Sequence, residues 1–312
     1  MATVQVAAAA LQYESLAAAL PSTLRLGTSS WSFPGWHGLV WADRSKPTEL
    51  SRHGLAAYGR HPLFRTVCVD STFYAPVAPD RLAAYADQVP GDFHFVVKGA
   101  RAVTSPFDES GRVNPQYLDA RFAAHQVVAP FAEGMGAKGA VLLFQFPPQG
   151  GRITGQPRTF ATALGEFLAA LPRSVPYAVE LRDAPLLTDD YREALRRGGA
   201  HHCLSAHPRL PPLSRQAEFA AGDDGPLVLR WMLHRRHGYR QAVQRYAPFG
   251  ALVDEDPQTR AEVAALCLGA SAAGREVLVI ANNKAEGCAP LTLVRLAEAI
   301  NGGQNSDAGG AT

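Results

Sequence analysis

The stretch RTVCVDSTFY, residues 65–74, decides how the rest of the chain is interpreted. Its first half is apolar, as in a buried strand, and its second half places three polar residues and two aromatic rings directly after that strand. A plain turn would use Gly, Pro or Asn at this point. We therefore expect groups at the end of this strand, such as Asp70 and Tyr74, to meet a ligand.

Seven other short apolar runs resemble this one and recur along the chain. They are near-continuous, as in parallel strands that are buried on both faces. The eight runs are LRLGTS (24–29), TVCVDS (66–71), HFVVKG (94–99), AVLLFQF (140–146), YAVELR (177–182), HHCLSA (201–206), LVLRWM (227–232) and EVLVIAN (276–282).

Helical patterns lie between these runs, for example at residues 47–61, 114–136 and 188–199. Thr188 is a suitable N-cap for the last of these, and Pro130 is expected to end or kink the second. Eight strands alternating with helices predict an α/β protein with a single domain, a TIM-type (β/α)8 barrel. The alternative is a doubly wound α/β sheet, but neither a GxGxxG motif after the first strand nor a P-loop is present.

Length and composition set the domain organisation and the class of protein. We divide the 312 residues into an Ala-rich N-terminal arm or helix (1–22), the barrel (23–301) and a disordered tail (302–312). No apolar run is long enough to span a membrane, the N-terminus lacks the basic start of a signal peptide, and the four cysteines are scattered. We therefore expect a cytoplasmic protein without a cofactor or a metal site. The oligomeric state stays open.

Active sites of TIM barrels lie at the carboxyl ends of the strands, and these ends supply the candidate residues. The candidate catalytic residues are Glu180, Asp70 and Lys98. The candidate substrate-binding residues are Trp31, Tyr74, Arg101, Gln145, Arg182, Arg230, Asn282, Asn283 and Lys284. Because several cations converge on one concave site, we expect an anionic or phosphate-bearing partner.

Structural interpretations of the same residues stay open. Lys98 could pair with Asp70 or Glu180 and hold the top of the barrel together, since inward charges in barrels usually occur in pairs. Glu180 and Arg182 lie two residues apart on one face of their strand, so they could form a structural ion pair. Trp31 and the other tryptophans of SSWSFPGWHGLVW, residues 29–41, are more often packing residues than stacking platforms.

These strand ends also carry a resemblance to a known family. The stretches are GTSSWSFPGW (27–36), VDSTFYAPVAPDRLAAYA (69–86), FHFVVKGARAVT (93–104), LLFQFPP (142–148), AVELR (178–182) and ANNKAEGCAPL (281–291). On them, the chain resembles the domain-of-unknown-function family 72, the YecE-like family. The resemblance implies a TIM-type barrel related in shape to the xylose isomerase and endonuclease-IV-like barrels, and it implies no settled activity.

The chain departs from the family pattern at several strand ends and resembles a divergent member. Cys68 and Asp70 stand where the family usually has Glu and Asn, so one carboxylate is kept but displaced by two residues. Ser105, Asp183 and Met232 stand in the stretches where histidines are expected. If the family's chemistry uses those histidines, this chain has altered it.

The function expected from these residues is an enzyme of the hydrolase or isomerase type that binds an anionic or phosphorylated substrate at the barrel mouth. One alternative is a non-catalytic binding module for nucleic acid or protein, although the net charge of +2 gives nucleic-acid binding weak support. The other is an endonuclease-IV-like metal nuclease, which rests on the shape of the barrel alone.

Overall fold

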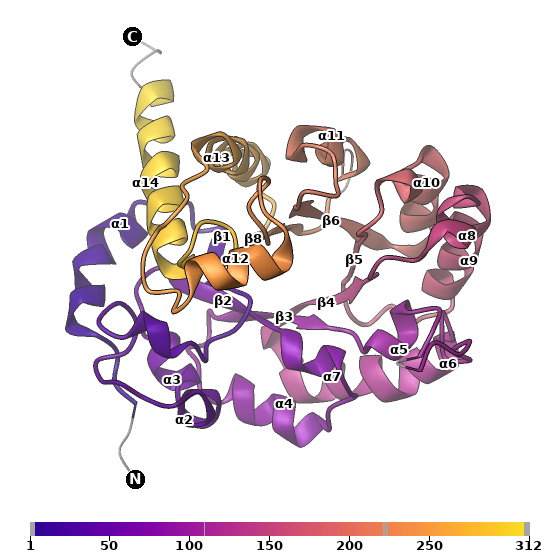
Figure 1. The fold of residues 1–312 in the computed structure, drawn as a ribbon, viewed down its shortest axis with the longest axis horizontal. Coiled ribbons are helices and arrows are strands. Elements are labelled where there is room, and N and C mark those ends of the chain that lie inside the picture. The colour runs from indigo at the N-terminus through magenta and orange to yellow at the C-terminus, as the bar shows by residue number, and fades with distance from the viewer. Residues whose placement is uncertain (1–3, 109, 221, 223, 309–312) are drawn as a thin grey trace.

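The structure, a computed structural model, describes residues 4–308 apart from 109, 221 and 223. Eight parallel strands form a closed barrel in sequential order, with β8 paired to β1 (Figure 1). The strands are β1 Leu24–Thr28, β2 Phe64–Val69, β3 His94–Lys98, β4 Gly139–Gln145, β5 Tyr177–Glu180, β6 Ala200–Ala206, β7 Leu227–Trp231 and β8 Val277–Ala281. The prediction of a (β/α)8 barrel is confirmed, and the alternative of an open doubly wound sheet is wrong.

Helices surround the barrel and connect its strands (Figure 1). They are α1 Glu14–Ala18, α2 Pro47–His53, α3 Leu55–Tyr58, α4 Pro79–Ala86, α5 Arg101–Thr104, α6 Ala120–Ala123, α7 Ala129–Met135, α8 Gly151–Thr154, α9 Pro157–Ala169, α10 Asp189–Gly198, α11 Leu213–Ala217, α12 Tyr239–Tyr246, α13 Pro257–Ala272 and α14 Ala289–Ala308. Helix α10 begins where predicted, because Thr188 accepts a hydrogen bond from the Tyr191 amide. It ends at Gly198, and the next residue, Gly199, caps it with a φ of 61° that suits glycine. None of the helices in the described ranges combines the length and apolar character needed to cross a membrane.

The long helix predicted at 114–136 is shorter and irregular. A π-helical turn, Ala124–Val128, separates α6 from α7. Pro130 lacks an N–H, and in a regular α-helix its ring would collide with the carbonyl four residues earlier. The π-helical turn widens the helix directly before Pro130, so the proline distorts the helix without ending it.

Both ends of the described chain pack against the barrel and against each other. The amide of Ala7 donates to the Val40 carbonyl at 2.9 Å, and the side chain of Asn301 in α14 donates to the Leu16 carbonyl at 3.1 Å. The N-terminal segment is therefore a docked 3-10 helix, Ala8–Tyr13, followed by α1. The tail expected from residue 302 is helical over 302–308, because α14 continues to Ala308. Residues 309–312 lie outside the described residues.

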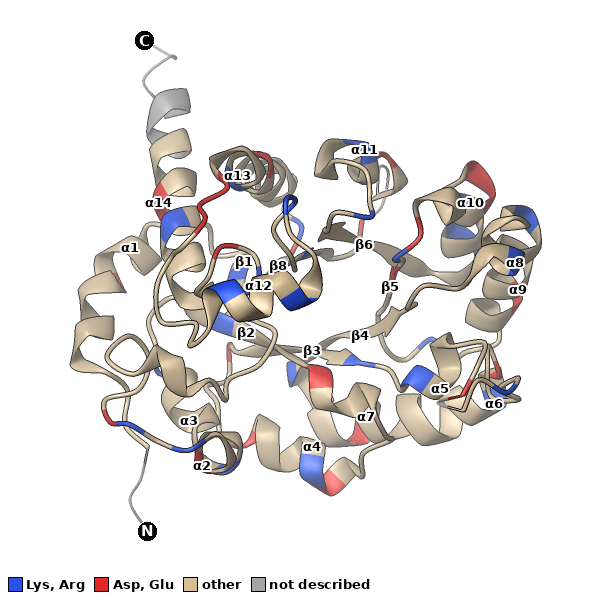
Figure 2. Cartoon of the chain, viewed as in Figure 1, with Lys and Arg blue, Asp and Glu red and all other residues tan. Residues whose placement is uncertain are grey.

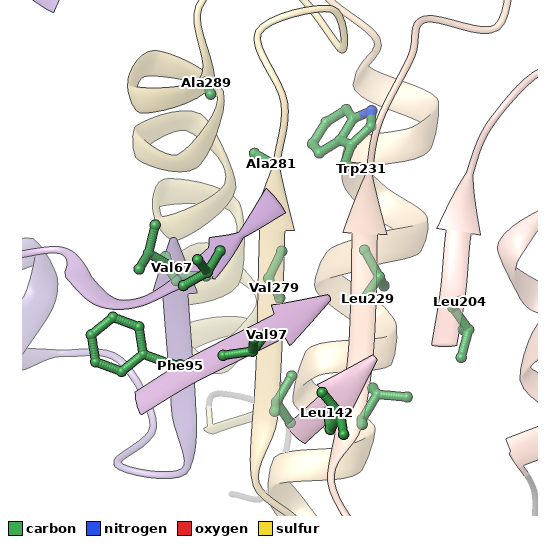
Figure 3. Packing of buried hydrophobic residues seen from close by; sticks show 14 of the residues in the cluster. Val67, Phe95, Val97, Leu142, Leu204, Leu229, Trp231, Val279, Ala281 and Ala289 are labelled. Atoms are coloured by element: carbon green, nitrogen blue, oxygen red, sulfur yellow. The ribbon is translucent and has the colours of Figure 1, made fainter. Parts of the chain in front are cut away.

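Successive residues of each strand point alternately towards the helices and towards the barrel axis. The helix-facing residues form the main core with the surrounding helices, and Figure 3 shows Val67, Phe95, Leu142 and Leu229 in this layer. Most of the residues in a second, smaller apolar cluster face the axis. Its members are Cys68, Val96, Ala140, Val141, Leu143, Ala178, Cys203, Val228, Leu278 and Ile280. This cluster fills the barrel below the strand ends and supports the side chains above it.

Candidate functional site

The axis-facing side chains change from apolar to polar at the carboxyl ends of the strands. At seven strand ends, a polar residue follows two positions after a member of the smaller apolar cluster, and period-2 alternation places both on the inner face. The pairs are Cys68 and Asp70, Val96 and Lys98, Leu143 and Gln145, Ala178 and Glu180, Cys203 and Ser205, Val228 and Arg230, and Ile280 and Asn282. This polar tier closes the mouth of the barrel.

Arg230 lies at the centre of this tier and is fully buried. Its Nη1 donates to Glu180 Oε2 at 2.5 Å, and its Nη2 donates to Asp70 Oδ1 at 3.1 Å. Burial alone would lower the pKa of this guanidinium, but Glu180 and Asp70 outweigh burial and raise the pKa well above its usual value. Arg230 is therefore a permanent cation that joins two carboxylates from opposite parts of the barrel.

Glu180 is held through both of its oxygens. Its Oε1 lies 2.6 Å from Arg182 Nη2 and accepts a hydrogen bond from Ser205 Oγ at 2.9 Å, while Oε2 accepts from Arg230. Burial favours the neutral acid, but Arg182, Arg230 and Lys98 outweigh burial and lower the pKa of Glu180 to about 2. Glu180 is therefore ionised at neutral pH and fixed in position.

Asp70 connects this pair to a third cation. Its Oδ1 lies 3.7 Å from Lys98 Nζ and accepts a hydrogen bond from the Cys68 thiol at 3.2 Å. The Asp70 side chain is 31% exposed, whereas that of Arg230 is fully buried. Lys98 Nζ also lies 4.1 Å from the centre of the Phe73 ring, a cation–π contact, and burial lowers the pKa of Lys98. Solvent therefore reaches this network at Asp70.

Five residues thus form one line of alternating charge, which we call the mouth network: Lys98, Asp70, Arg230, Glu180 and Arg182. Figure 2 shows charged segments of both signs around the strand ends as well as on the outer helices. The ion pairs Lys98–Asp70 and Glu180–Arg182 that the sequence analysis left open are both present. The network has three cations and two carboxylates, so it carries an excess of one positive charge.

Three further polar side chains lie close to the network. Lys284 is stacked on Tyr239 with Nζ 4.8 Å from the ring centre, and burial lowers its pKa to about 8. Burial, together with Arg182, lowers the pKa of His207 to about 4, so this histidine is neutral at pH 7. Gln145 is 8% exposed and makes no side-chain hydrogen bond within the part of the chain that the structure describes.

Two candidate residues are used in packing. Trp31 is buried, and its ring meets the Tyr85 ring edge-on with centres 5.1 Å apart. Asn283 accepts hydrogen bonds from Trp36 Nε1 at 3.1 Å and from the Ala289 amide at 2.8 Å. The first contact packs the loop after β1 on α4, and the second ties the start of α14 to the rim. The burial of Trp31 and its contact with Tyr85 support the packing interpretation of this residue.

The remaining candidates lie on the rim. Asn282 donates to Ser29 Oγ at 2.7 Å and accepts from the Lys284 amide at 3.0 Å, which fixes the end of β8. Tyr74 is 81% exposed and, with Arg101, lines a separate cavity beside the network. The structure therefore brings Asp70, Lys98, Gln145, Glu180, Arg182 and Arg230 together on the inner face of the mouth. It leaves Tyr74 and Arg101 outside the network.

Residues that replace expected family histidines have local structural partners. Ser105 donates to the Phe107 carbonyl at 2.8 Å. Asp183 accepts from the Gln149 amide at 2.7 Å and from Arg209 Nη2 at 2.8 Å. These side chains shape the loops after β3 and β5 without joining the mouth network.

Two members of the site are not among the candidate catalytic and substrate-binding residues. Ser205 donates to Glu180 and is fully buried, and the Phe73 ring supports Lys98. Strand alternation places Ser205 at the mouth, because it lies two residues after the buried Cys203, but its partner Glu180 is known only from the structure. The contact of Phe73 also required the structure, because its position depends on the 3-10 helix Asp70–Phe73 that follows β2.

The His, Cys, Asp and Glu side chains are the groups that would bind a metal ion. Within the described residues, no group of three or more of them could hold a metal ion, so no ligand cluster supports the metal-nuclease alternative in that part of the chain. A cavity of about 700 Å3 lies along α10, from Asp189 to the start of β6 at Ala200, and none of the mouth network residues lines it. Its position separates it from the mouth network.

Comparisons with known proteins agree with this architecture. The family described as "Protein of unknown function DUF72" matches residues 25–310. A DUF72 family protein from Enterococcus faecalis V583 shares 17% identity with a TM-score of 0.60, covering 89% of this chain and 95% of that one. A DUF72 family protein from Thermotoga maritima MSB8 shares 18% identity with a TM-score of 0.58, covering 88% and 98%. No curated protein matches the chain. The identities with the two solved structures are low, so those likenesses concern the fold, but the family match spans nearly the whole barrel: the chain belongs to the DUF72 family.

Proposed function

We propose that the barrel mouth binds an anionic, phosphate-bearing small molecule as the substrate of a hydrolase- or isomerase-type reaction. The observation that carries this proposal is the charge of the mouth network, in which three cations face two carboxylates. Buried charges in proteins are usually balanced by partners, because an unbalanced charge in a low-dielectric site is costly. A bound anion would supply the missing negative charge.

The cations at the two ends of the network are the best placed to hold that anion. Lys98 and Arg182 have side chains that are 9% and 11% exposed, whereas Arg230 between them is completely covered. Lys284 adds a further positive charge at neutral pH, since its pKa is about 8. Cations that converge at a concave site of low dielectric attract phosphate more strongly than the same charges in water.

The two carboxylates would have different roles. Glu180 was expected to transfer a proton, but its low pKa and its two occupied oxygens make it a poor proton acceptor. We assign Glu180 the role of positioning Arg182 and Arg230. Asp70 is partly exposed and touches both Lys98 and Arg230, so it is the carboxylate within reach of a substrate. Asp70 is the proposed proton acceptor, and Gln145 is the proposed neutral hydrogen-bonding partner of the substrate.

The test is calorimetric titration with sulfate, inorganic phosphate and sugar phosphates, together with thermal unfolding in their presence. The variant is Lys98→Met, which keeps the length and apolar stem of the side chain and removes the charge. The matched control is Lys46→Met, because Lys46 is exposed and lies before α2, away from the network.

We expect the wild type and the control to bind a phosphate-bearing ligand and Lys98→Met to bind it at least about tenfold more weakly. A ligand at about 100 times its dissociation constant adds about 2.7 kcal/mol to stability, which a thermal scan resolves. The proposal is overturned if no anion binds, or if Lys98→Met melts well below the wild type while its anion affinity is unchanged. In the second case Lys98 serves only the barrel.

A further inference from the structure

A second cavity opens beside the Lys98 end of the mouth network. It measures about 220 Å3 and is lined by Tyr74, Arg101, Phe107, Asp108 and Gln116, among others. Pockets for drug-sized ligands usually measure about 300–1,000 Å3, so this cavity is sized for one ring or a short chain. It would hold a part of a ligand whose remainder lies elsewhere.

Apolar side chains are unusually exposed around this cavity. Tyr74 is 81% exposed and Phe107 47%, and Val113, which pairs with Phe107 in an antiparallel bridge, is 78% exposed. They are three of the six large hydrophobic side chains that are exposed in the described part of the chain. Exposed apolar groups that gather at one place mark binding sites more often than those scattered singly.

The loop that carries Phe107 is held in shape by its own hydrogen bonds. The Asp108 carboxylate accepts from the amides of Ser110 and Arg112, both at 2.9 Å. Asn114 Nδ2 donates to the carbonyls of Ala102 and Ser105, both at 2.7 Å. These hydrogen bonds, together with the Phe107–Val113 bridge, hold the described residues on either side of Phe107, which favours a preorganised position for its ring.

Two aromatic contacts link the cationic mouth to a residue that lines this cavity. The Lys98 ammonium lies 4.1 Å from the centre of the Phe73 ring, and the Phe73 and Tyr74 rings meet edge-on with centres 5.8 Å apart. Arg101, which lines the cavity, begins α5 three residues after Lys98. A group attached to an anion at Lys98 can thus extend past Phe73 towards Tyr74.

We propose, resting on the anion site above, that this cavity holds a flat aromatic ring attached to the anionic group, so that the substrate class is aryl or nucleoside phosphates. Two aromatic side chains at one rim favour a flat partner over an alkyl chain, because stacked and edge-on ring contacts add attraction beyond buried area. Stacking one base on an aromatic side chain typically changes affinity by about fivefold to a hundredfold.

The experiment compares methyl phosphate, phenyl phosphate and adenosine monophosphate by calorimetry. The variants are Tyr74→Ala and Phe107→Ala, with Tyr74→Phe as a rescue that keeps the ring. Leu11→Ala is the matched control, since Leu11 is 51% exposed and belongs to the N-terminal 3-10 helix. We expect the wild type to bind one of the two aromatic phosphates at least about fivefold more tightly than methyl phosphate. Comparing these two aromatic ligands separates the aryl source from the nucleoside source.

Tyr74→Ala and Phe107→Ala should remove most of that preference while leaving methyl phosphate affinity within about twofold, and Tyr74→Phe and Leu11→Ala should keep it. Equal affinity for all three ligands, with each weakened by Lys98→Met, would overturn the ring site and leave the anion site standing. A preference that survives in the two alanine variants would also overturn it. If none of the phosphates binds, both proposals fail.

Discussion

Arg230 Nη1 lies 2.5 Å from Glu180 Oε2, and neither side chain is exposed to solvent. This pair joins the ends of β5 and β7, which flank β6, and anchors the mouth network at its centre. Its geometry fixes the positions of the cations on either side, because Glu180 also holds Arg182 and Arg230 also holds Asp70. The site therefore depends on this buried ion pair, since removing either member would leave the charge of the other buried without this partner.

Replacing Glu180 with glutamine should destabilise the protein strongly. The change leaves Arg230 and Arg182 buried with one carboxylate fewer, and breaking a buried ion pair from one side typically costs about 3–5 kcal/mol. Urea unfolding at neutral pH measures this loss. The control is Glu193→Gln, since Glu193 lies on the surface of α10 and pairs with exposed Arg196. If both variants unfold at the urea concentration of the wild type, the network contributes nothing to stability.

Acid should remove the contribution of Glu180 in a defined range of pH. The pKa of Glu180 falls from 4.5 to about 2 on folding, so its stabilisation is complete above about pH 4.5 and is lost as the pH falls towards about 2. The shift corresponds to about 3 kcal/mol. The difference in unfolding free energy between wild type and Glu180→Gln, measured in urea at several pH values, should therefore shrink over this range. A difference that stays constant would contradict the assignment.

Sulfate binding should weaken as Lys284 loses its proton. Burial lowers the pKa of Lys284 to about 8, so the ammonium is charged below that pH and neutral above it. Its positive charge therefore assists an anion at about pH 7 and no longer does so at about pH 9. Calorimetry with sulfate, which keeps its charge throughout this range, measures the change without titration of the ligand. Lys284→Met should flatten the profile, and an identical profile in this variant would place Lys284 outside the anion's reach.

The fold was predictable because each strand carries its own local signal. Runs such as AVLLFQF and EVLVIAN are apolar on both faces, as a closed parallel barrel requires, and the eight predicted strands match the structure within a few residues. The break in the helix around Pro130 was only partly predictable, because the π-helical turn that accommodates the proline depends on the surrounding packing.

The sequence predicted which side chains lie at the strand ends better than it predicted how they pair. Strand ends gave Asp70, Glu180 and Arg230, because period 2 along a strand decides which side chains face the axis. Two of the ion pairs, Lys98–Asp70 and Glu180–Arg182, could be weighed from the sequence. The contact of Arg230 with both carboxylates could not be predicted, since it depends on how the strand ends are arranged around the closed barrel. Asn283 shows the limit of inferring a role from position alone. A polar residue after a strand can bind a ligand, or it can accept hydrogen bonds from a backbone amide and from a tryptophan of another loop, as Asn283 does.

Replacing Asn283 with alanine should therefore affect stability and leave binding intact. The side-chain oxygen accepts hydrogen bonds from Trp36 Nε1 and from the Ala289 amide, and both residues are buried. Leaving such buried donors unpaired costs about 1–3 kcal/mol. Urea unfolding should show this loss, while calorimetry should give a sulfate affinity within about twofold of the wild type, because no atom of Asn283 belongs to the mouth network. The opposite result, unchanged stability with weakened sulfate binding, would return Asn283 to the substrate-binding residues and would mean that the loop after β8 moves to expose its side chain when an anion enters.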